Sequence, residues 1–270
     1  MDGDHVTDRA AEQPAASSPA RRSFYRQDGD LFVPTVLSVS PWTGKTQSGL
    51  ALAGLLAHLL EGAQPPTPML TARLTIDILG APPTEPLASA VRVIRDGRRM
   101  QMLEAELTIG ARIWARATAL RTRLMDSPPF EEPNPYIVPP DIVPDGPGVS
   151  RGDWWEIVSI PKSQRVEGRT AQWLRLPVDV IEGVPLSPLS RFAISGDFGG
   201  GTAMPLNANQ WTFANLDIAL FLNRLPEGEW LLLAPEAHSA GLGMATAHTR
   251  FGDRRSLFGH ALQTHFLDHR

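Results

Sequence analysis

An apolar helix followed by strands of alternating character is the feature that most restricts the fold of this chain. Residues 47–61 (QSGLALAGLLAHLLE) are apolar around almost the whole helical circumference, which predicts a buried helix. Apolar and polar side chains then alternate with a period of two in three segments, 73–78, 103–109 and 111–117. This alternation is typical of strands with one face in the core. The first half therefore predicts one buried helix followed by an antiparallel sheet.

The second half of the chain repeats this order of parts. Strand-like segments at 154–160 and 170–181 come first. A helix then begins with Ser187 as its N-cap and Pro188 at the first helical position, both favoured residue types at those positions. We expect the glycine run 199–201 to end this helix. Four further strands are predicted, at about 211–223, 229–237, 241–251 and 257–266.

A duplication explains why both halves share this order. The pentapeptides 74–78 (LTIDI) and 214–218 (ANLDI) align, and a proline-containing turn follows each of them, which indicates an internal repeat. Eight prolines between Pro128 and Pro147 predict an extended connector between the copies.

The predicted organisation has four parts and an α+β fold class. They are a disordered leader (1–22), a first unit (23–124), a proline-rich connector (125–149) and a second unit (150–270). Each unit is one long buried helix wrapped by a curved antiparallel sheet. Two such units form a pseudo-dimer, and free sheet edges favour association into a homo-oligomer.

Composition excludes several classes of function. The 270 residues carry a formal net charge of −4, which argues against a nucleic-acid partner because binders of the phosphate backbone are usually basic. The lack of cysteine excludes disulfides, iron–sulfur clusters and a thiol nucleophile. No apolar stretch is long enough to span a membrane. The leader lacks the apolar core of a secretory signal, so we expect a cytoplasmic protein.

Several fragments, taken in order, resemble one known family. In the first half they are FVPT (32–35), RDGRR (95–99) and RATA (116–119), and in the second half WTFANLD (211–217), GEWL (228–231) and GHALQ (259–263). This order is similar to that of the double-hotdog acyl-CoA thioesterases. The resemblance implies two tandem hotdog folds and hydrolysis of an acyl-CoA thioester, without a cofactor.

The resemblance also implies a catalytic set. In type II acyl-CoA thioesterases an Asp, a Thr and a Gln position and activate a water molecule. Asp197 and Gln263 match the family's Asp and Gln, whereas Asn215 stands where the family usually has Thr or Ser. An amide is both a donor and an acceptor, so Asn215 remains a candidate for holding the water.

The residues themselves suggest how such a site would work. A carboxylate in apolar surroundings has a raised pKa and can take a proton from water. Asp197 follows an apolar helix, and we expect it near a helix C-terminus whose dipole disfavours negative charge. Backbone N–H groups around Gly49, at the start of the first helix, are the candidates for binding the substrate oxyanion.

The repeat favours catalysis over a plain turn role for Asp197. The first-half positions aligned with Asp197 and Gln263 fall near Ala57 and Ala119. Asp77 and Asp217, in contrast, occur in both halves and are expected to serve the fold. Polar groups retained in only one copy are what a single asymmetric active site would leave.

Two alternatives remain beside hydrolysis. A non-catalytic acyl-CoA-binding protein fits the exchange of Thr for Asn215. A hotdog hydratase or dehydratase fits Ser195-Gly196-Asp197, but the histidine of that signature is replaced by Thr202. A metal site is not expected, because the C-terminal histidines (260, 265 and 269) are spaced five and four residues apart, which does not suit one strand face.

Overall fold

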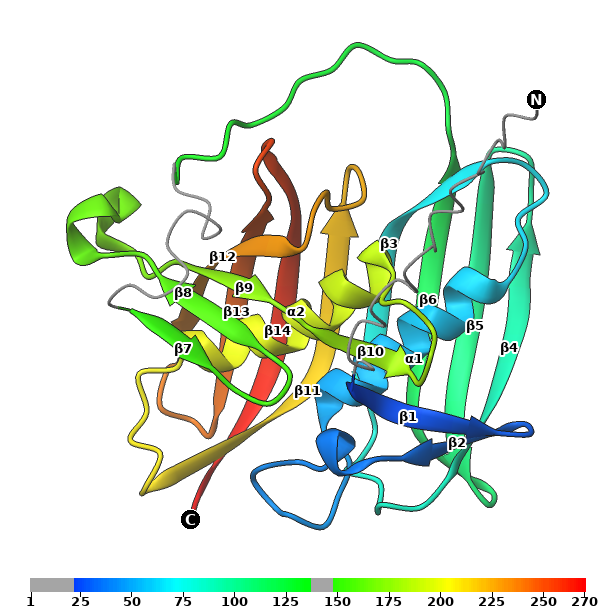
Figure 1. Cartoon of the computed structure of the whole chain (residues 1–270), viewed down its shortest axis with the longest axis horizontal. Helices are drawn as coiled ribbons and strands as arrows, with labels where there is room; N and C mark the ends of the chain where they lie inside the picture. Colours follow the sequence, from blue (N-terminus) through cyan, green and yellow to red (C-terminus); the bar gives the residue numbers. More distant parts are fainter. Residues whose placement is uncertain (1–21, 137–147) are drawn as a thin grey trace, which may run out of the picture.

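The computed structural model describes residues 22–136 and 148–270. Its strands form one 14-stranded sheet in these residues, in the order β10-β1-β2-β4-β5-β6-β3-β11-β14-β13-β12-β9-β8-β7. The sheet curves around two helices that pack against each other (Figure 1). The predicted leader, apart from Arg22, and residues 137–147 of the predicted connector lie outside the described residues.

The first half contains one long helix and six strands within the described residues. The helix is α1 (Gly49–Gly62). The strands are β1 (Arg22–Asp28), β2 (Leu31–Pro34), β3 (Met69–Ile78), β4 (Leu87–Asp96), β5 (Met100–Ile109) and β6 (Arg112–Arg123). The apolar circumference of α1 is explained by its position, since residues 51–57 are buried between the sheet and the second helix.

The second half has the same plan. Its long helix is α2 (Pro188–Ala203), with the Ser187 hydroxyl accepting a hydrogen bond from the Ser190 amide at the predicted N-cap. The strands are β7 (Val149–Arg151), β8 (Glu156–Ser159), β9 (Gln172–Arg175), β10 (Val178–Ile181), β11 (Trp211–Leu222), β12 (Trp230–His238), β13 (Met244–Gly252) and β14 (Leu257–His269). The segment predicted as one strand at 170–181 is two strands, β9 and β10.

The two halves join through antiparallel pairing of β3 with β11. Asp77 lies directly opposite Asp217 in this ladder, and these are the residues that the internal repeat aligns. Equivalent residues that face each other place a pseudo-two-fold axis at this point. At the other end, β1 of the first half pairs in parallel with β10 of the second. One hydrophobic core runs through both halves, so the fold is two hotdog units packed as a pseudo-dimer.

The prediction that the glycine run ends the second helix is wrong, because α2 continues to Ala203. The glycines instead let the helix approach the sheet. A Cβ on Gly199 would lie 2.9 Å from Thr249 Oγ1, one on Gly200 would lie 2.3 Å from Gln263 Oε1, and one on Gly201 would lie 3.1 Å from the Phe213 ring. Close packing against β11, β13 and β14 thus outweighs the low helix propensity of glycine.

We predict that Gly200→Ala destabilises the fold although alanine favours helix. Its Cβ would push α2 away from β14, at a cost of about 1–3 kcal/mol for overpacking. Gly62→Ala is the matched control, because a Cβ there meets nothing within 4 Å and should stabilise by up to about 1 kcal/mol. Urea denaturation measures both effects. Equal stabilisation by the two substitutions would contradict this packing.

Candidate active site

The N-terminus of α1 lies against a carboxylate from the other half of the molecule. Gly49 is the first residue of α1, and a Cβ at this position would lie only 2.8 Å from Asp197 Oδ1. The N-cap residue Ser48 forms no side-chain capping bond, and its buried hydroxyl has no partner among the described residues. Because first-turn amides lack intrahelical acceptors, the start of α1 presents N–H groups close to Asp197.

Two carboxamides from neighbouring strands meet Asp197. Asn215 Nδ2 on β11 donates to Asp197 Oδ1 at 2.5 Å and to its backbone oxygen at 3.3 Å. Gln263 Nε2 on β14 donates to the same backbone oxygen at 3.3 Å. The structure therefore brings together all four residues that the sequence singles out, Gly49 included.

A β-bulge explains how Asn215 comes to face the helices. The β11–β14 register shifts between Asn215 and Asp217, which leaves Leu216 as an extra residue. Asp217 Oδ1 accepts a hydrogen bond from the Thr264 amide beside this bulge. A bulge of this kind redirects the neighbouring side chains. Asp217 thus serves the backbone, as expected, while Asn215 points toward α2.

Burial raises the pKa of Asp197 to about 6, and the hydrogen bond from Asn215 opposes this rise. Of the two causes predicted for a raised pKa, the apolar surroundings agree with this result, whereas the nearby helix C-terminus is wrong. The helix runs six residues beyond Asp197, to Ala203, and the effect of a helix end fades within about one turn. Desolvation is what keeps this carboxylate basic enough to accept a proton near neutral pH.

Two acceptor atoms at the site have no partner among the described residues. They are Asn215 Oδ1 and Gln263 Oε1, both buried. Buried polar atoms in folded proteins are nearly always paired with protein or water. These two oxygens can therefore accept both hydrogen bonds that one water molecule donates.

The corresponding helix start in the other half offers fewer free N–H groups to a ligand, because one is capped and another is absent. The Ser187 hydroxyl caps α2 by accepting from the Ser190 amide at 3.0 Å, and it donates to the Glu61 carboxylate. Pro188 occupies the first helical position and has no N–H. The two helix starts thus differ, since α1 is uncapped opposite Asp197 and α2 is capped opposite Glu61.

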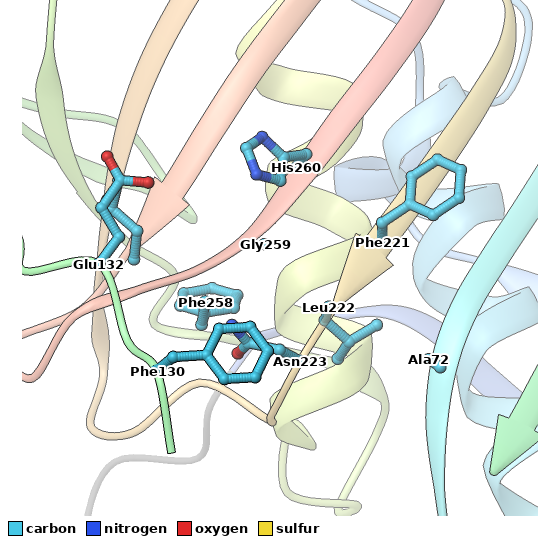
Figure 2. Close-up of a pocket in the computed structure, with 10 residues that line it drawn as sticks. Ala72, Phe130, Glu132, Phe221, Leu222, Asn223, Phe258, Gly259 and His260 are labelled. Atoms are coloured by element: carbon cyan, nitrogen blue, oxygen red, sulfur yellow. The ribbon is translucent and has the colours of Figure 1, made fainter. Parts of the chain in front are cut away.

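A separate hollow lies on the outer face of the sheet. It has a volume of about 450 Å³, and Figure 2 shows Phe130 and Glu132 beside it, with Phe221, Phe258 and His260. His260 and Phe221 are outward-facing, whereas Gln263 and Ile218 on the same strands face inward. This hollow shares no residue with the site around Asp197.

The C-terminal histidines have different surroundings. His260 Nδ1 lies 3.0 Å from His248 Nε2 on the outer face. The His269 ring lies against Trp211, with 3.9 Å between the ring centroids. His265 is fully buried on the inward face of β14. No group of three or more metal-ligating side chains occurs in residues 22–136 and 148–270. Period-two spacing on β14 places His265 on the same face as Gln263, which is the sequence signal that could have marked it as a neighbour of the candidate site.

We predict that Asp197→Asn stabilises the protein at pH 7 but not at pH 4. The folded state holds the Asp197 proton more tightly than the unfolded chain does, so stability falls as pH rises from about 4 to about 6. Each pKa unit corresponds to about 1.4 kcal/mol. Thermal unfolding between pH 4 and 8 should show that the difference in Tm between the variant and the wild type increases across this window. A Tm difference that is independent of pH would contradict the raised pKa.

Comparisons with known proteins agree with this architecture. Residues 38–122 match the acyl-CoA thioesterase N-terminal domain, and residues 125–267 match the acyl-CoA thioesterase C-terminal domain. No curated protein sequence matches the chain. No helix of the described residues is long and apolar enough to cross a membrane.

Solved structures share the fold at low identity. The acyl-CoA thioesterase II TesB2 of Mycobacterium marinum is 18% identical, with a TM-score of 0.67 over 91% of this chain and 95% of that one. A hotdog-fold protein of unknown function from Alicyclobacillus acidocaldarius is 17% identical, with a TM-score of 0.66 over 90% and 95%. Since the two domain matches together span most of the sequence, the chain belongs to the acyl-CoA thioesterase family, with its N- and C-terminal hotdog domains in tandem.

Proposed function

We propose that this protein hydrolyses the thioester bond of an acyl-CoA, with Asp197 as the general base. The observation that carries the proposal is the position of one half-buried carboxylate. Asp197, with its pKa raised to about 6, touches both the uncapped start of α1 and the Asn215 carboxamide. A base of this pKa is largely ionised at pH 7 and still takes a proton effectively.

The reaction follows from these positions. A water molecule that donates a hydrogen bond to the Asp197 carboxylate attacks the thioester carbon and transfers a proton to Asp197. The carboxamides of Asn215 and Gln263 hold Asp197 in place for this step. The carbonyl oxygen becomes an oxyanion, which the amide N–H groups at Gly49 stabilise. The intermediate then expels the CoA thiolate as the carbon–sulfur bond breaks. The proton on Asp197 passes to the thiolate, which regenerates the base.

Asn215 does part of the work expected of the family's hydroxyl residue. Its Nδ2 donates to Asp197, while its Oδ1 remains available to water. A threonine hydroxyl at this position would also supply one donor and acceptor oxygens. Direct attack by water also agrees with the lack of cysteine in the chain. The matches to acyl-CoA thioesterase domains and the likeness to the M. marinum acyl-CoA thioesterase II support acyl-CoA as the substrate class.

We predict that Asp197→Asn lowers kcat for acyl-CoA hydrolysis by about 10²–10⁴-fold, the usual contribution of a general base. The release of free CoA thiol measures this, and the protein contributes no thiol background because it lacks cysteine. Asp77→Asn is the matched control. Asp77 pairs with Arg116 in the first half, so its loss should change kcat by less than about twofold.

The outcomes separate the competing functions. Undiminished turnover in Asp197→Asn would exclude its role as the base. A wild-type protein that binds acyl-CoA without releasing thiol would be a binding protein, and one that hydrates an enoyl-CoA instead would be a hotdog hydratase.

We predict that Gly49→Ala lowers kcat by about 10²-fold, the typical cost of losing one oxyanion donor. The added Cβ would lie 2.8 Å from Asp197 Oδ1 and 3.0 Å from Ile78 Cδ1, so it would occupy the space in front of the first-turn amides. Gly62→Ala, at the far end of the same helix, is the control for helix propensity. Equal activity of the two variants would show that the carbonyl does not bind at Gly49.

A further inference from the structure

His265 is a buried imidazole without a hydrogen-bond partner. Its side chain is fully buried on β14, and neither Nδ1 nor Nε2 has a partner among the described residues. Its ring meets Phe213 edge-on, with 5.7 Å between the centroids. An unsatisfied buried polar group destabilises the folded state, so its presence here requires an explanation.

This imidazole lies next to both carboxamides of the site. It follows Gln263 by two residues on the inward face of β14 and stands directly opposite Asn215 on β11. The Cβ position of Gly200 would lie 2.8 Å from His265 Cε1 and 2.3 Å from Gln263 Oε1. The missing side chain of Gly200 therefore leaves room for the imidazole and the Gln263 carboxamide together.

The hydrogen-bonding groups in this space are complementary. Asn215 Oδ1 and Gln263 Oε1 only accept hydrogen bonds, and both lack a donor. Burial lowers the pKa of His265 to about 4, and the Asp217 charge opposes this only in part. A neutral imidazole offers one N–H donor and one acceptor nitrogen. One water molecule can donate to both carboxamide oxygens while it accepts from the imidazole N–H.

The first half has no polar side chain at this position. Asp77 and Asp217 lie opposite each other, and their partners on the next strands are Arg116 and Thr264. Counted from these partners, Gln263 corresponds to Ala115, rather than to a position near Ala119, and His265 corresponds to Ala117. Both alanines are buried. The buried polar pair thus belongs to the half that carries Asp197, and departures of this kind concentrate at functional sites.

We propose that His265 is a positioning residue of the hydrolytic site, which holds a water molecule between Asn215 Oδ1 and Gln263 Oε1. This inference rests on the proposed hydrolysis. The water keeps both oxygens turned toward His265, and so keeps Nδ2 of Asn215 and Nε2 of Gln263 turned toward Asp197. Without it, a rotated carboxamide places its oxygen against the Asp197 oxygens and loses the hydrogen bond that orients the base.

The test compares His265→Leu with His265→Gln in the full chain. Leucine has a similar volume and no polar atom, so we expect kcat to fall about 10-fold through loss of orientation, with KM changed by less than about twofold. Thermal stability should change little, because the variant loses the hydrogen bond from the imidazole to the water and also the cost of burying the imidazole. Glutamine supplies a donor and an acceptor and should keep kcat within about threefold of wild type.

Thr249→Val is the matched control. Thr249 is also fully buried on the same sheet face, and its hydroxyl has no partner among the described residues, but it packs on Gly199 rather than on the carboxamides. Its replacement should leave kcat unchanged. Wild-type kcat in His265→Leu, or equal losses of kcat in the leucine and glutamine variants, would overturn the proposal. A wild-type protein without thioesterase activity would instead contradict the proposed function.

Discussion

The contact between the start of α1 and Asp197 on α2 is the interaction on which the site depends. Neither half contains the site alone, since the amides come from the first unit and the carboxylate and carboxamides from the second. The β3–β11 ladder and the packing of α1 on α2 hold these parts in register. Duplication and fusion therefore supply the dimer-like geometry within a single chain.

The pseudo-symmetry of the backbone is broken by side chains. At the second helix start, Ser187 provides a cap, Pro188 removes an amide and Glu61 occupies the adjoining space. The cap of α1 is left unmade, and unsatisfied polar atoms gather in the sheet beneath α2. Within the described residues, hydrogen bonds are thus left unmade on the side of the axis where α1 meets Asp197. This is the side where a substrate carbonyl and a water would supply the missing hydrogen bonds.

Periodicity predicted the elements whose faces differ in burial. The buried helix at 47–61 and strands β3, β5 and β6 follow their apolar patterns closely, whereas β4 was not predicted because its apolar residues Val93 and Ile94 are exposed. The end of α2 was misjudged because glycine propensity is local, while the contacts of Gly199 and Gly200 with β13 and β14 are not. The site residues themselves came from the family resemblance. These residues meet because of the bulge at Leu216. A bulge leaves no periodic pattern in the sequence, so it could not be predicted.

The most direct test of this account is a structure with a ketone analogue of acyl-CoA, in which a methylene group separates the carbonyl carbon from sulfur. We predict that the carbonyl oxygen accepts hydrogen bonds from the first-turn amides of α1 at Gly49, with the carbonyl carbon facing Asp197. A carbonyl bound at the capped start of α2, or in the outer hollow beside Phe130 and His260, would contradict a site shared between the two halves.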